Sequence, residues 1–221
     1  MLFYLIFQQS SLEFYIKLII FLTYTFAVIF AITFHEFAHS FVANKLGDKT
    51  PKMQGRLTLN PLAHFDYLGL FCFIFFGFGW AKPVPINTYN FKNIKRDTLF
   101  VSLSGIVTNI IFAFIFYPLY LLFSSISDSS IVLIIITYLC YNIYQANLVF
   151  AVFNLLPIYP LDGFNAIATQ LKYSNPYVSF MRRYGGFVLL FVILIFSQTN
   201  IFSYLVYYVG YPISWFWGLF F

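Results

Sequence analysis

Long apolar segments constrain the fold of this chain more than any other feature of its sequence. A transmembrane helix needs roughly 20 mostly apolar residues, and residues 18–43, 99–123, 131–153 and 187–208 reach that length. Residues 68–80 form a shorter apolar segment with three glycines, so we expect it to be re-entrant or tilted. Only 9% of the 221 residues are charged, against about 25% in a soluble domain. The sequence predicts an all-α integral membrane protein and excludes a soluble enzyme, a disordered chain and a nucleic-acid binder.

The segment between the first two long spans has a different character. Its strings LTLNPL and AKPVPINTYNF contain prolines, which fix φ and push the preceding residue out of the helical region. We expect extended or turn structure there, including a small β-sheet near the membrane interface. With residues 68–80 and the aromatic C-terminal string, we expect about five to six transmembrane helices. The whole chain, residues 1–221, is expected to form one polytopic domain, with the re-entrant or short β elements between the first and second long spans.

Basic residues give the predicted spans an orientation. Eight of the twelve Lys and Arg residues lie between the first span and residue 99, and three more lie between residues 153 and 187. The connecting string SSISDSS has none. Because cytoplasmic loops carry an excess of Lys and Arg, we expect both basic segments on the cytoplasmic side and SSISDSS outside. The C-terminal end of the first span then lies at the cytoplasmic side of the membrane.

That end of the first span carries the string HEFAH, residues 35–39. Residues four apart share one face of a helix, so the imidazoles of His35 and His39 can bind one metal ion. Glu36 follows the first histidine at the spacing of the zinc metalloprotease motif, in which this carboxylate is the general base. The alternative is a set of polar groups that pair or cap near a helix end. Ionisable residues inside a span are costly and indicate function, which favours the metal.

A catalytic zinc ion takes three protein ligands and a water, so one ligand is missing from the HEFAH helix. Asp162 is the strongest candidate because it lies in the apolar string NLLPIYPLDGF. Pro157 and Pro160 interrupt the helix there, and the chain can turn the carboxylate back toward the protein interior. Taken alone, the string PLDG favours an ordinary surface turn. Beside a zinc helix that lacks a ligand, it favours a metal site with one Zn²⁺ per chain.

Several strings together resemble the site-2 protease family of intramembrane zinc metalloproteases. They are HEFAH (35–39), GRLTLNPLAHFDYLG (55–69), GWAKPVPINTYNF (79–91), NLLP (154–157) and PLDG (160–163), in the family's order. The resemblance is to compact bacterial members, and we expect no PDZ or CBS module in a chain of this length.

The resemblance implies a role for each motif residue. His35, His39 and Asp162 match the zinc ligands, and Glu36 matches the catalytic glutamate. Asn154 matches a residue that hydrogen-bonds the substrate or the developing oxyanion, an interaction typically worth about 3 kcal/mol. The alternative for Asn154 is a bond to a neighbouring backbone group at a helix break.

The resemblance covers about residues 31–163, with departures. Tyr67 stands where the family often has proline, and SGIVTN (104–109) replaces a string similar to GPLAN. His64 could support a ligand or gate the substrate, but a hydrogen-bonded structural histidine is favoured. The two cysteines are predicted to be buried thiols without a disulfide.

These observations predict an intramembrane zinc endopeptidase of a bacterial inner membrane that cuts a transmembrane helix near the cytoplasmic side. Its expected partners are a transmembrane protein substrate and the lipid bilayer, with no nucleic acid. Regulation would come from a prior cut in the substrate or from a membrane partner, and the oligomeric state stays open. One alternative is a metal-binding transporter or channel, which would need polar residues along several spans. Another is an inactive scaffold, disfavoured because the ligand pair and the base are intact.

Overall fold

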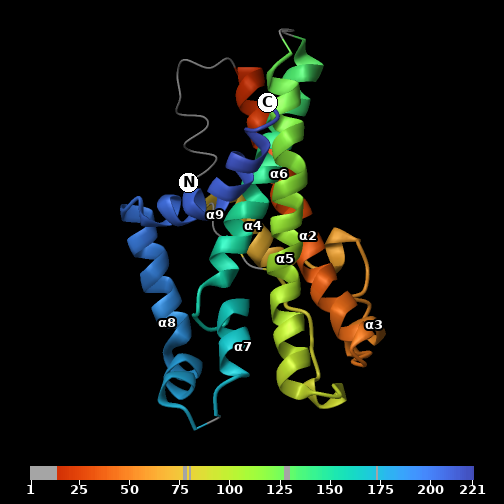
Figure 1. Ribbon diagram of the computed structural model, residues 1–221, viewed down its shortest axis with the longest axis vertical. Helices are drawn as coiled ribbons and strands as arrows, with labels where there is room; N and C mark the ends of the chain where they lie inside the picture. Colours follow the sequence, from red (N-terminus) through yellow and green to blue (C-terminus); the bar gives the residue numbers. More distant parts are fainter. Residues whose placement is uncertain (1–13, 77–78, 80, 127–129, 173) are drawn as a thin grey trace.

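The computed structural model describes residues 14–221 except 77–78, 80, 127–129 and 173 (Figure 1). Helices dominate this part of the chain, and no strand forms among the residues described. The elements are α2 (Phe14–Lys45), α3 (Thr50–Met53), the 3₁₀ helix η1 (Pro61–Ala63), α4 (Tyr67–Phe76), the 3₁₀ helix η2 (Thr88–Asn90), α5 (Ile94–Ser124), α6 (Ile131–Leu155), α7 (Asp162–Ala168), α8 (Pro176–Gln198) and α9 (Ile201–Trp217).

Four of the described helices, α2, α5, α6 and α8, are long and apolar enough to cross a membrane. The predicted class, an all-α membrane protein, agrees with this composition, but the predicted five to six spans are not confirmed in the described residues. Residues 68–80 contribute only the ten-residue helix α4 in the part described.

The predicted span over residues 187–208 is wrong, because two helices meet inside it. Helix α8 ends at Gln198 and α9 begins at Ile201. Thr199 adopts an extended conformation at this break, and its hydroxyl donates to the carbonyl of Ile195 at 2.9 Å. Thr and Asn side chains compete for backbone hydrogen bonds and so favour helix ends over helix interiors. Helix α9 then returns to pack against α6 and α5, while α8 lies to the side (Figure 1).

The β elements expected between the first two long spans are reduced to one antiparallel bridge, between Phe65 and Ala81, in the described residues. The amide of Lys82 donates to the carbonyl of His64 beside it at 2.9 Å. Beyond this point the chain continues to η2 without further strand pairing. Pro83 and Pro85 carry no N–H group, which disfavours a continuous ladder.

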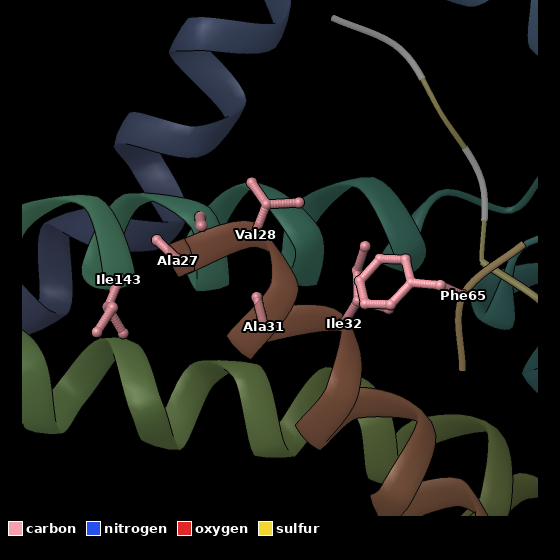
Figure 2. Close-up of a cluster of buried hydrophobic side chains, with 7 residues drawn as sticks. Ala27, Val28, Ala31, Ile32, Phe65 and Ile143 are labelled. Atoms are coloured by element: carbon pink, nitrogen blue, oxygen red, sulfur yellow. The ribbon is translucent and has the colours of Figure 1, made fainter. Parts of the chain in front are cut away.

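Small residues bring α2 close to α5 and α6 (Figure 1). Ala27 and Ala31 of α2 are fully buried, and Figure 2 shows them with Val28, near Ile143 of α6. Lipid tails are as apolar as these side chains, so close packing rather than hydrophobic burial stabilises such contacts. Phe65 packs on the same cluster from the loop, and this fixes the loop against α2 next to the HEFAH string.

Polar contacts add to the packing of these helices. The amide of Asn142 on α6 donates to the hydroxyl of Thr23 on α2 at 2.9 Å. The indole N–H of Trp217 at the end of α9 donates to the carbonyl of Phe114 on α5 at 3.0 Å. These bonds help to set the mutual rotation of the packed helices.

Candidate metal centre

Two histidines and one aspartate meet at a single point between α2 and α7. Nε2 of His35 lies 3.0 Å from Nε2 of His39, and both lie against Oδ2 of Asp162, at 3.0 and 3.1 Å. The two imidazoles are buried and the carboxylate is partly buried. The structure therefore brings together the three residues predicted as metal ligands, although His39 and Asp162 are 123 positions apart in the chain.

Asp162 reaches this point because α6 stops and the chain reverses. Helix α6 ends at Leu155, and a turn with two prolines leads into α7, whose first residue is Asp162. The turn is tight: a side chain at Gly163 would strike the backbone carbonyl of Leu155. Only glycine allows the two backbones to approach so closely, and this explains the Asp-Gly pair of the PLDG string.

Helix α5 holds both imidazoles in place through residues spaced four apart. Nδ1–H of His39 donates to the carbonyl of Val101 at 2.7 Å, and Nδ1 of His35 lies 2.6 Å from Oδ1 of Asn109. Between them Gly105 leaves room for the ring of His35, because a Cβ there would come within 2.5 Å of Cε1. Metal-bound histidines usually bond their second ring nitrogen in this manner, which fixes the tautomer and the orientation of the ring.

This donor set fits a zinc ion. With both Nδ1 atoms hydrogen-bonded, the Nε2 lone pairs of His35 and His39 face each other and the carboxylate of Asp162. Zinc binds such ligands at about 2.0–2.2 Å in tetrahedral geometry, which places ligand atoms about 3.3 Å apart. The observed separations of 3.0–3.1 Å are close to that value. Three protein ligands leave the fourth position for water or substrate, as catalytic zinc sites require.

A cavity of about 460 Å³ opens in front of the ligand group. The half-buried carboxylate of Glu36 lines this cavity, and so does Asn154 near the end of α6. The Asn154 amide donates to the carbonyl of Phe150 in its own helix at 3.1 Å, which is the alternative contact considered from the sequence. The catalytic role of each side chain stays a prediction.

One wall of the cavity is the segment 83–88, which leads into η2, and Asp48 anchors it. The buried Asp48 carboxylate accepts from the backbone N–H of Asn87 and from the side-chain amide of Asn90, each at 2.8 Å. It also accepts from the Thr50 hydroxyl at 2.6 Å. Burial raises the pKa of Asp48, but these hydrogen bonds outweigh burial and hold that pKa below its usual value. Sequence analysis gave Asp48 no role.

His64 is hydrogen-bonded through one ring nitrogen, while its buried Nδ1 has no partner among the described residues, and its role stays a prediction. The side chain is fully buried, and its Nε2 lies 2.8 Å from the carbonyl of Thr58. Cys140 is buried and Cys72 partly buried, and both are free thiols. Four residues of α5 were missed as partners of the histidines: Val101, Ser104, Gly105 and Asn109. The detectable signal was a glycine and an asparagine four residues apart inside an apolar span.

The His-Glu-x-x-His motif lies on a helix and meets a distant aspartate, as in the metal centres of zinc metalloproteases. Here this type of centre lies among helices long enough to cross a membrane. Comparison with known proteins points the same way. The chain is 42% identical over 151 residues to "Putative zinc metalloprotease YwhC" of Bacillus subtilis, a match that covers 63% of this chain and 65% of that protein. The resemblance to the site-2 protease family is supported by this similarity. No protein-family model and no solved structure matches the chain.

Proposed function

We propose that the chain is a zinc endopeptidase that hydrolyses a peptide bond within or near a transmembrane helix of another membrane protein. One observation carries the proposal. Three ligand atoms converge within 3.1 Å of one another at the cavity that Glu36 also lines, and the helix that bears the motif is long enough to span a membrane. The similarity to a protein named as a zinc metalloprotease supports the same reading.

The residues around the cavity divide the chemistry among them. Zinc bound by His35, His39 and Asp162 would lower the pKa of a coordinated water to about 7 and polarise the scissile carbonyl. Glu36 accepts the proton of the attacking water and passes it to the leaving amine. Asn154 turns its amide from the Phe150 carbonyl toward the substrate and donates to the oxygen on which negative charge develops.

A substrate helix must unwind locally before it can be cut. Its carbonyls are engaged in intrahelical hydrogen bonds, and lipid offers no replacement for them. The segment 83–88 lines the cavity, and Val84 and Ile86 in it carry backbone N–H groups with which a second strand could pair. We place the unwound substrate against this segment by strand addition.

The distribution of charge supports a cytoplasmic active site in a bacterial inner membrane. Basic residues precede α5 and follow α6 in the sequence, so they lie at the same end of these two helices as the metal centre. Such an excess of Lys and Arg marks the cytoplasmic side. The substrate is a transmembrane protein, and its release for cleavage would depend on a prior cut or on a regulatory membrane partner.

The transporter alternative receives less support. It needs polar groups that line a path through the spans, but the buried amides of Asn109, Asn142 and Asn147 bond to one another and to α2. Their hydrogen-bonding capacity is used inside the bundle, which favours the protease.

The test is Glu36→Gln, which keeps the size of the side chain and removes the proton acceptor. We expect the variant to insert and bind zinc as wild type does, and to lose cleavage by at least 10²-fold, the lower end of what a positioned acid–base group contributes. The assay compares membrane peptides by mass spectrometry in cells with wild type or variant, and zinc content is measured on the same preparations.

Asp66→Asn is the matched control. The change is also carboxylate to amide, and Asn can still accept from the amides of Leu68 and Gly69 as Asp66 does. Normal proteolysis is expected for this control. Normal proteolysis by zinc-loaded Glu36→Gln would refute the proposed mechanism.

A further inference from the structure

A continuous chain of hydrogen bonds runs from α6 through α5 to the metal centre. The side-chain amide of Asn109 donates to Oδ1 of Asn147 at 2.8 Å, and Oδ1 of Asn109 lies 2.6 Å from Nδ1 of His35. Asn109 and Asn147 are fully buried and His35 nearly so. No other ligand of the centre contacts a buried side-chain amide in the described residues.

Two backbone carbonyls fix the direction of this chain, because a carbonyl can only accept. The amide of Asn147 donates to the carbonyl of Ile143 at 2.8 Å, so its oxygen faces Asn109. The amide of Asn109 donates to the carbonyl of Ala31 at 3.2 Å as well as to Asn147. The oxygen of Asn109 therefore faces His35, and each hydrogen bond along the chain joins a donor to an acceptor.

The orientation of Asn109 determines where His35 carries its proton. An oxygen at 2.6 Å from Nδ1 requires a proton on Nδ1, because two acceptors would repel at that distance. Turning the amide around would place its NH₂ group against His35 and break two buried hydrogen bonds. The Nε2 lone pair of His35 is thereby left for the metal.

We propose that Asn109, oriented by Asn147, is a positioning residue that fixes the tautomer and ring orientation of His35 and thereby sets the affinity of the centre for zinc. This inference rests on the metal centre of the proposed function but needs no proteolysis. The contact between Asn147 and Asn109 also couples α6, which bears no metal ligand, to the metal centre.

The test measures zinc affinity of the full chain, purified in detergent, by competition with a chelating fluorophore. Asn109→Leu removes the acceptor with little change of volume, and we expect affinity to fall by about 10–100-fold. Asn109→Asp keeps an acceptor for Nδ1 while losing the bonds to Asn147 and Ala31. We expect it to stay within about threefold of wild type in affinity, although its unfolding temperature falls.

Asn142→Leu is the matched control. Asn142 is also a buried amide on α6, and it bonds Thr23 of α2 away from the cavity. We expect this variant to lose thermal stability and to bind zinc as wild type does, which separates loss of packing from loss of positioning. Asn147→Leu leaves Asn109 in place with one partner fewer, so a smaller loss of affinity in the same direction is expected.

Three results would overturn the inference: Asn109→Leu binding zinc within twofold of wild type, Asn142→Leu weakening zinc as much as Asn109→Leu, or Asn147→Leu with no loss. If Asn109→Leu does not fold, the comparison of Asn147→Leu with Asn142→Leu decides. A wild-type protein that binds no zinc would refute the proposed function itself. Tight zinc binding without proteolysis would refute that function and leave the positioning role intact.

Discussion

A methyl group added at Gly105 should loosen the metal centre without unfolding the protein. The structure places a Cβ at this position 2.5 Å from Cε1 of His35 and 2.7 Å from both ring nitrogens. Ordinary contact begins near 3.4 Å, so the ring must move by about 0.9 Å, or α5 must retreat by as much. Such a shift carries Nε2 of His35 out of the group of three ligand atoms.

The expected magnitude follows from that displacement. Mispositioning a reacting group by about 1 Å can cost 10²-fold in rate, and disturbing the support of a metal ligand costs about 10–100-fold in affinity. We therefore expect Gly105→Ala to bind zinc at least 10-fold more weakly than wild type. The zinc-free variant should still fold, because the ring of His35 is the end of a side chain and alanine favours a helix over glycine by about 1 kcal/mol.

The assay is zinc competition in detergent, with the unfolding temperature of the zinc-free protein measured alongside. Gly186→Ala is the matched control, since Gly186 is also helical and a Cβ added there would meet nothing within 4 Å. We expect the control to keep zinc affinity and to match or exceed wild type in stability. Zinc binding by Gly105→Ala within twofold of wild type would show that α5 does not restrain the ring.

Three further predictions concern the loop anchor, the turn before α7 and the topology. Because the pKa of folded Asp48 is lowered, its stabilisation is complete above the unfolded value of about 3.9 and is lost as pH falls through the folded value. The unfolding temperature of Asp48→Asn should lie below that of wild type at neutral pH, with the difference vanishing in acid, by scanning fluorimetry. Gly163→Ala should lower zinc content to that of Asp162→Ala, measured by metal analysis, because α7 cannot keep its place. An impermeant thiol reagent added to intact cells should label a cysteine at Ser125 but not one at Lys172, with the native cysteines replaced; the reverse pattern would contradict a cytoplasmic active site.

The apolar helices were predictable because lipid imposes length and composition on any helix that crosses it. Helices α2, α5 and α6 therefore lie close to their predicted ranges. The failure at 187–208 has the same origin, since a long apolar segment conceals a short polar interruption, SQTN, at residues 197–200. Two helices that meet at such an interruption and one continuous helix have nearly the same mean hydropathy.

The ligand group was predictable for a different reason. The spacing of His35 and His39 encodes their common face directly, since it is local. Asp162 could be proposed only because a chemical requirement, the third zinc ligand, selected it among few carboxylates. The contacts of Gly105 and Asn109 depend on how α5 is rotated against α2, and no local pattern specifies that rotation.

The two histidines are held by groups of different kinds, and this difference has a consequence for how the centre can change. His39 donates to the backbone carbonyl of Val101, which any residue at that position would supply as long as α5 packs on α2. Its Nδ1 also lies 3.2 Å from the hydroxyl of Ser104, which donates to the same carbonyl. His35 bonds a side chain, Asn109, which one substitution removes. Substitution of Asn109 therefore removes the Nδ1 partner of His35, whereas substitution of Ser104 leaves His39 its backbone partner. Because Asn147 of α6 orients Asn109, a small rotation of α6 reaches the metal through His35 as well as through Asp162, whose turn packs against the end of α6.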